Sequence, residues 1–119
     1  MSVYRDEHER CPRCGTDLTQ AGSVRACTAC RGMWVQEDIL ITMAANMFAP
    51  PKRAPVPLVP EPRQPLPCPT CREAMATWTL HAIAIDRCAA HGLWFDRDEL
   101  QIVLRAIGDP TYRRRLEDR

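Results

Sequence analysis

A cysteine pattern that occurs twice decides the fold of this 119-residue chain. Residues 11–40 read CPRCGTDLTQAGSVRACTACRGMWVQEDIL, and residues 68–100 read CPTCREAMATWTLHAIAIDRCAAHGLWFDRDEL. Each stretch begins with a Cys-x-x-Cys pair and contains a second pair, Cys27/Cys30 in one and Cys88/His91 in the other. All seven cysteines of the chain lie in these pairs. Two pairs in each stretch give the spacing that is typical of a tetrahedral zinc site.

The spacing predicts two structural zinc sites. Two thiolates that are two residues apart on a tight turn can both face one cation at about 2.3 Å. Four protein ligands leave no coordination position for water or substrate, so we expect two Zn²⁺ ions per chain that hold structure and do not catalyse. The predicted ligands are Cys11, Cys14, Cys27 and Cys30 for one ion, and Cys68, Cys71, Cys88 and His91 for the other.

The histidines have different predicted places. His91 occupies the position of a fourth thiolate, and an imidazole can replace a thiolate without a change of coordination number. The second stretch is also one residue shorter between Cys88 and the following tryptophan, which the longer reach of an imidazole would offset. His8 and His81 have no matching ligand pair, so we expect them in solvent and on a strand face.

Disulfide and redox interpretations of the cysteines are weaker. The stretch MSVYRDEHER has no apolar segment that would direct export, and no run approaches about 18 apolar residues. An odd number of thiols also fits a disulfide framework poorly, and no pair has the strand-helix-strand context of a thioredoxin motif. We therefore expect a cytoplasmic protein without a membrane span.

Composition indicates small metal-stabilised modules. Only 6% of the residues are aromatic and 11 are proline, which argues against one large hydrophobic core. Eight of the prolines lie in the segment 50–67, which predicts an extended polyproline tether that acts as a spacer or as a docking strip for an aromatic groove. The predicted division is an N-terminal arm (1–10), a first zinc ribbon with helix (11–49), a Pro-rich linker (50–67), a second zinc ribbon with helix (68–108) and a C-terminal short helix (109–119).

Local patterns predict a hairpin and a helix in each module. MATWTL (75–80) and AIAIDR (82–87) have the β-branched and aromatic content of paired strands, whereas only GSVRA (22–26) does so in the first module. Asp96 and Glu99 have the spacing of a capping box before an amphipathic run, and Gln36 replaces the capping acid in the first module. Asp109 followed by proline predicts the start of a further helix.

These motifs together resemble the transcription factor IIB-type zinc ribbon family, in its small bacterial tandem form. The shared elements are CPxC, a second ligand pair, Gly-x-Trp and a helix that begins near Asp-x-x-Glu-Leu; the first copy lacks the Asp and Glu of the last element. The resemblance implies a small α+β fold of two tandem zinc ribbons, each a β-hairpin plus a helix. Trp34 and Trp94, which follow the ligand pairs, are expected to form the small core that joins hairpin to helix rather than stacking platforms for bases.

Three functions remain open at this point. Closed metal sites, a net charge of +1 and helices with excess apolar surface favour a non-enzymatic adaptor that binds proteins, with self-association as a further option. The alternative is a nucleic-acid-binding ribbon in transcription or translation, supported by arginines near the ligand pairs. These arginines are Arg13, Arg25, Arg31, Arg72 and Arg87. A thiol sensor that releases zinc on oxidation is the weakest hypothesis, because zinc-bound sulfurs in a closed site are protected.

Overall fold

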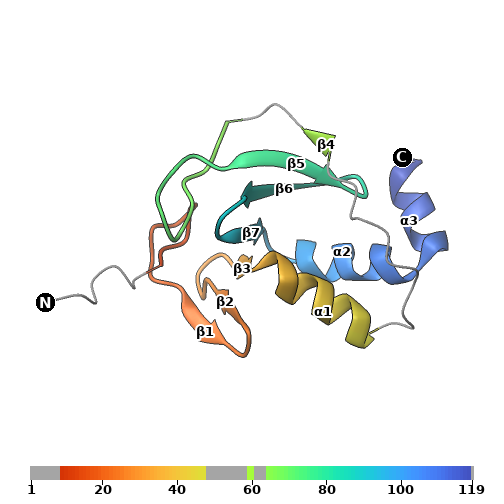
Figure 1. Ribbon diagram of the computed structural model, residues 1–119, viewed down its shortest axis with the longest axis horizontal. Helices are drawn as coiled ribbons and strands as arrows, with labels where there is room; N and C mark the ends of the chain where they lie inside the picture. Colours follow the sequence, from red (N-terminus) through yellow and green to blue (C-terminus); the bar gives the residue numbers. More distant parts are fainter. Residues whose placement is uncertain (1–8, 48–58, 61–63, 119) are drawn as a thin grey trace, which may run out of the picture.

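A single antiparallel sheet and three helices make up the described part of the chain, which in the computed structural model is residues 9–47, 59–60 and 64–118 (Figure 1). The strands are β1 (Thr19–Ala21), β2 (Val24–Ala26), β3 (Met33–Val35), β4 (Val59–Pro60), β5 (Ala76–Leu80), β6 (Ile83–Cys88) and β7 (Gly92–Phe95). The helices are α1 (Glu37–Met47), α2 (Glu99–Gly108) and α3 (Pro110–Glu117). The prediction of a small α+β fold is therefore confirmed.

The two halves of the chain share this sheet, which answers a question that the sequence left open. The strand order is β1-β2-β3-β7-β6-β5-β4, so the first three strands belong to the first half and the rest follow from the central β3–β7 pair. In that pair Trp34 lies opposite Trp94, and Val35 lies opposite Leu93. The sequence did not predict β3 and β7 as strands. Their pairing joins the two predicted modules into one continuous sheet.

The two hairpins differ in length. β1 and β2 pair over three residues each, whereas β5 and β6 pair from Ala76 opposite Arg87 to Leu80 opposite Ile83. His81 and Ala82 form the two-residue turn of the longer hairpin, with φ values of 50° and 71°. Positive φ at both positions matches the right-handed twist of the strands. His81 therefore lies in a turn, and its predicted place on a strand face is wrong.

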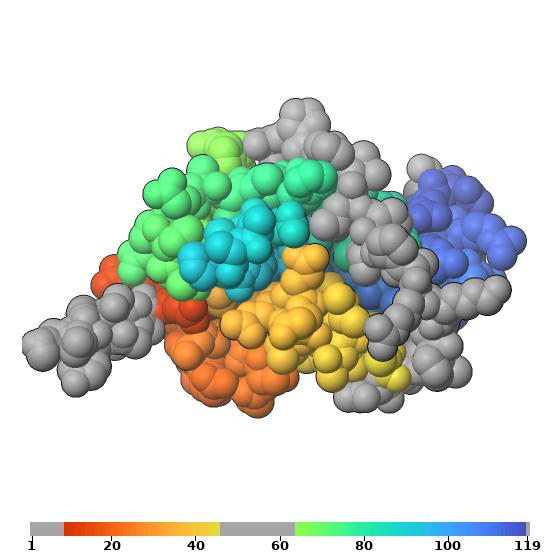
Figure 2. Space-filling view, in the orientation of Figure 1, coloured from red at the N-terminus to blue at the C-terminus, as the bar shows by residue number. Residues whose placement is uncertain are grey.

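Helices α1 and α2 lie side by side and pack against the sheet (Figure 1). Their buried side chains, such as Leu40 from α1 and Val103 from α2, join Val35 and Phe95 from the central strands in one cluster. Figure 2 shows the same association at the surface, where the orange and yellow first half borders on the green and cyan second half. Most of the apolar helix surface is thus used within the chain.

Only part of the predicted capping is observed. Asp109 caps α3 as predicted, because its carboxylate accepts hydrogen bonds from the amides of Thr111 and Tyr112. At α2, Glu99 Oε1 accepts from the Asp96 amide at 3.0 Å, which is one half of a capping box. The carboxylate of Asp96 does not supply the other half: it binds Trp94 and Arg13 instead. Asp98, in the left-handed region, is the residue before the helix and has no side-chain capping bond.

Two residues of the predicted Pro-rich tether belong to the sheet. Val59 pairs with Thr79 and Pro60 with Trp78, which makes β4 the outer strand beside β5. At these two residues the segment is therefore a paired strand, and the prediction of a polyproline tether is wrong there. A proline is tolerated at a sheet edge because the bond that it cannot donate is not needed there. Residues 50–58 and 61–63, and His8 in the arm, lie outside the described residues.

Two further predictions concern the tryptophans and the lack of a membrane span. Trp34 and Trp94 are buried, as predicted, but they pack with the cysteines of both ligand clusters and not in the core cluster that contains the helix side chains. Trp78 is partly buried against the helix-containing core, with the Arg87 guanidinium 6.0 Å from its ring centroid. Within the described part of the chain, every helix is too short or too polar to span a bilayer.

Candidate metal centres

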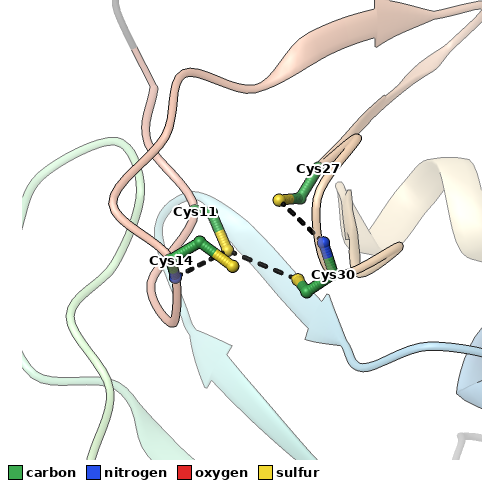
Figure 3. Close-up of side chains that lie close together, drawn as sticks. All are labelled: Cys11, Cys14, Cys27 and Cys30. Carbon is green, nitrogen blue, oxygen red and sulfur yellow. Dashed lines mark hydrogen bonds between the residues drawn. The ribbon is translucent and has the colours of Figure 1, made fainter.

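Four cysteine side chains of the first half point toward one another (Figure 3). Cys11 and Cys14 come from the turn that precedes β1, and Cys27 and Cys30 come from the turn between β2 and β3. Their sulfur atoms all lie within 4.8 Å of one another. Cys11 and Cys27 are buried, Cys30 is partly buried, and Cys14 is exposed. The hairpin therefore brings the two predicted ligand pairs into one cluster.

The ligand turns owe their shape to hydrogen bonds within each turn. In the first turn the amides of Arg13 and Cys14 donate to Cys11 Sγ at 3.4 and 3.2 Å, and the Gly15 amide donates to the Cys11 carbonyl at 2.9 Å. The turn at Cys68 repeats this arrangement, with amide to sulfur distances of 3.3 and 3.4 Å. Such amides stabilise a negative sulfur, which is the form that binds metal.

The residue that closes each of these turns lies in the left-handed region. Gly15 has φ 76°, and the corresponding Arg72 and Arg31 both have φ 68°. A left-handed residue lets its amide reach back to the carbonyl of the first cysteine, as the 2.9 Å bonds of Arg31 and Arg72 show. Glycine adopts this conformation without strain, whereas the two arginines accept a modest cost.

The second cluster contains Cys68, Cys71, Cys88 and His91, and its ligand atoms also lie within 4.8 Å of one another. The turn from Cys88 is one residue shorter than the others, because the His91 amide itself closes it on the Cys88 carbonyl at 3.1 Å. His91 turns Nδ1 toward the sulfurs, 3.4 Å from Cys88 and 3.8 Å from Cys68. The imidazole thus occupies the fourth corner, which is the place that the sequence predicted for it.

The distances within both clusters fit a tetrahedral zinc ion. Zinc bonds of about 2.3 Å to sulfur and about 2.05 Å to nitrogen place two sulfurs about 3.8 Å apart, and a sulfur and a nitrogen about 3.6 Å apart. The observed sulfur pairs are 3.6 Å for Cys11–Cys30 and 3.9 Å for Cys71–Cys88. The two Nδ1 to sulfur distances of His91 bracket the second value. Both sets of residues could therefore hold zinc.

The same distances argue against disulfides. All seven cysteines are free thiols, and a disulfide requires about 2.05 Å between sulfurs.

The pKa values of the cysteine thiols differ within each cluster. Burial raises the pKa of Cys11 to about 12 and that of Cys68 to about 11. Burial acts in the same direction on Cys27, but the Thr16 hydroxyl and nearby amides outweigh it and lower the pKa of Cys27 to about 6. Burial is likewise outweighed at Cys88, where His91 is the main opposing group and the pKa is lowered to about 7. A divalent cation would supply the charge that allows every thiol of a cluster to lose its proton.

Residues outside the predicted ligand set support the clusters. Thr16 Oγ1 lies 3.4 Å from Cys27 Sγ, and no sequence motif marked this threonine. Asp96 accepts from Trp94 Nε1 at 3.1 Å and from Arg13 Nη2 at 2.9 Å, which ties the first ligand turn to β7. Groups of this kind orient ligands and influence metal affinity. Sequence could suggest Asp96 only as a helix cap.

Three of the arginines near the ligand turns face carboxylates. Arg13 pairs with Asp96, Arg25 Nε lies 2.6 Å from Glu9, and Arg87 Nε lies 2.9 Å from Glu37. The positive charge of these side chains is therefore largely balanced on the protein itself.

Comparison with known proteins finds a similarity in the second half. Residues 67–106 match the family model described as a transcription factor zinc-finger, that is, the transcription factor IIB-type zinc ribbon. This segment contains Cys68, Cys71, Cys88 and His91. No curated protein and no solved structure matches the chain.

Proposed function

We propose that this protein is a non-enzymatic adaptor, stabilised by two zinc ions, whose two ribbons bind macromolecules and mainly proteins, in a process related to transcription. One observation carries the proposal: each cluster places four ligand atoms within 4.8 Å of one another. A zinc ion held by four side chains has no open position for water or substrate. Such an ion stabilises the fold and leaves binding to the protein surface.

Charge favours a protein partner over nucleic acid. A protein that binds phosphates by counterion release presents Lys and Arg side chains whose charge is not otherwise balanced. Here Arg13, Arg25 and Arg87 already have carboxylate partners, and the net charge of the chain is only +1.

The outer face of α1 is the proposed contact point for a protein. Ile41 is 55% exposed, and it is the one large hydrophobic side chain that lies exposed in the described part of the chain. Its neighbours Thr42 and Ala45 are exposed as well. Ile39 and Ile102, the nearby isoleucines of α1 and α2, are partly buried, so they contribute less.

Affinity purification from the native cell, with bound protein and nucleic acid both identified, tests the proposal. We expect a protein partner whose recovery falls at least tenfold with Ile41→Asp, because burying a charge in an apolar contact is costly. Gln101→Glu, which places a charge at an exposed position of α2, is the matched control and should leave recovery unchanged. Equal recovery with both variants, or recovery of nucleic acid alone, would contradict the adaptor.

A second candidate function is binding of nucleic acid, which the family description of residues 67–106 favours. Arg31 and Arg72, both exposed and beside ligand turns, are its best candidates for phosphate contacts. A gel shift whose affinity falls by about one power of salt concentration for each phosphate contact, and weakens with Arg31→Gln and Arg72→Gln, would favour this function. A nucleic-acid affinity that does not change with salt concentration or with either substitution would exclude this function.

A further inference from the structure

We infer that the two metal centres take up and release metal as one unit, and that the two Gly-x-Trp motifs are the elements that couple them. The inference rests on the proposed metal binding, and it goes beyond that proposal. Tandem modules on a linker would each hold metal independently, whereas the contacts between the two halves predict a dependence of one centre on the other.

The two clusters share one core. Trp34 and Trp94 lie opposite each other in the central β3–β7 pair, and both are buried. They pack in the same cluster as Cys11 and Cys27 of the first centre and Cys68 of the second. Ligands of both centres therefore pack against one tryptophan pair, and a displacement of that pair would disturb the packing of both centres.

Each glycine of the motifs makes room for the opposite half. A Cβ atom on Gly32 would lie 2.2 Å from Cζ2 of Trp94. A Cβ atom on Gly92 would lie 2.7 Å from the carbonyl oxygen of Val35, and Gly92 also has φ +151°. Gly32 thus leaves space for the Trp94 side chain of the second half, and Gly92 leaves space for the Val35 backbone of the first half. This reciprocity gives the repeated Gly-x-Trp motif a role in joining the halves.

Polar contacts connect the ligand turns directly across the same boundary. Arg13, between Cys11 and Cys14, binds Asp96, whose carboxylate also holds the Trp94 indole. In the opposite direction, Thr70, between Cys68 and Cys71, donates its hydroxyl hydrogen to Glu9, which also pairs with Arg25 of β2.

Loss of metal from one centre therefore reaches the other by a physical route. Without its ion a ligand turn has only its two unbound ligand side chains and little core of its own, so the turn and its cross-boundary contact are released. The remaining centre then loses a polar partner on its ligand turn and part of the packing beneath it. We expect loss of one ion to weaken the metal affinity of the other centre by about 5- to 150-fold, which is the usual range for coupled binding sites, and to speed release from that centre.

The decisive experiment uses the full chain loaded with ¹¹³Cd²⁺, whose NMR signals differ for four-sulfur and three-sulfur, one-nitrogen ligand sets. Gly32→Ala lies in the first half, but its added Cβ would meet the Trp94 ring that packs with Cys68 of the second half, so the inference predicts that both signals weaken. We expect chelator to remove both ions faster from this variant than from the wild type. Gly22→Ala is the matched control, because Gly22 has a positive φ of 67° in the same half but nothing within 4 Å of its would-be Cβ. It should leave the second signal unchanged.

A second variant covers the case in which Gly32→Ala does not fold. Cys14→Ser changes one atom of an exposed side chain of the first centre, so it removes no buried packing contact that the fold needs. We expect the second centre of this variant to release its ion at least fivefold faster than in the wild type. Unchanged release there, or a wild type that loses its two ions in independent steps, would overturn the inference alone. A wild type that binds no metal would overturn the proposed function and the inference with it.

Discussion

Asp96 shows how a single side chain can serve a different purpose from the one that its sequence context suggests. The spacing Asp96/Glu99 is that of a capping box, and Glu99 does reach back to the Asp96 amide. The carboxylate instead accepts from Trp94 and Arg13, where it satisfies the indole N–H of a buried ring. Sequence cannot distinguish these uses, because the competing donor, Arg13, lies 83 residues away.

At this scale we predict that Asp96→Ala lowers the free energy of unfolding by about 1–3 kcal/mol, the usual cost of leaving a buried donor without an acceptor. Asp96→Asn keeps an acceptor for Trp94 and loses only a partly exposed ion pair, so its cost should be about 0.2–1 kcal/mol. Urea denaturation of the zinc-loaded variants, followed by tryptophan fluorescence, measures both. Equal effects of the two substitutions would show that the indole contact contributes nothing.

Among the elements, hairpins and helices could be predicted and the central strands could not. β5 and β6 have enough β-branched and aromatic residues to be recognised, and α2 has a clear apolar stripe that includes buried Val103 and Leu104. β3 has only three residues and β7 only four, which is too short for a period of two to appear. Their pairing depends on a contact between distant segments, and the sequence of either half alone contains no signal for it.

The C-terminal helix α3 is an element that should unfold separately. It has no buried residues, and its start depends on the two amide bonds that Asp109 accepts. We predict that Asp109→Ala frays α3, at a local cost of about 0.5–2 kcal/mol. Amide hydrogen exchange should rise across Pro110–Glu117 while protection in β5 and β6 is unchanged. Asp118→Ala, at the other end of the helix, is the control, and a loss of protection throughout the sheet would contradict a local role.

On the scale of the whole molecule, the sequence predicted the components and left their association open. Both clusters of ligands assemble as the spacing indicated, because each ligand pair is local and each hairpin is short. The balance of charge around them was not predictable, since Glu9 and Glu37 reach arginines on other elements. Whether the halves pack together depends on buried contacts between residues about 60 positions apart, such as Trp34 and Trp94.

For the whole chain we predict two zinc ions per molecule and a fold that depends on them. Structural zinc contributes on the order of 10–16 kcal/mol of apparent binding free energy, which is comparable to the entire folding free energy of a typical small domain. A strong chelator should therefore abolish the near-ultraviolet circular dichroism of Trp34 and Trp94, and excess Zn²⁺ should restore it. Elemental analysis that finds far less than two zinc ions, or a chain that stays folded in chelator, would refute the metal assignment.

The margins of the sheet have a consequence for solubility. Because the two halves pair through β3 and β7, those strands are interior, and the margins are left to β1 and β4. β1 has three residues and β4 has two, one of which is a proline. Strands this short offer few open backbone groups to a neighbouring molecule, and proline offers one fewer still. The order of strands in the sheet thus protects the protein from edge-to-edge aggregation, and concentrated solutions should remain clear for as long as both halves stay joined.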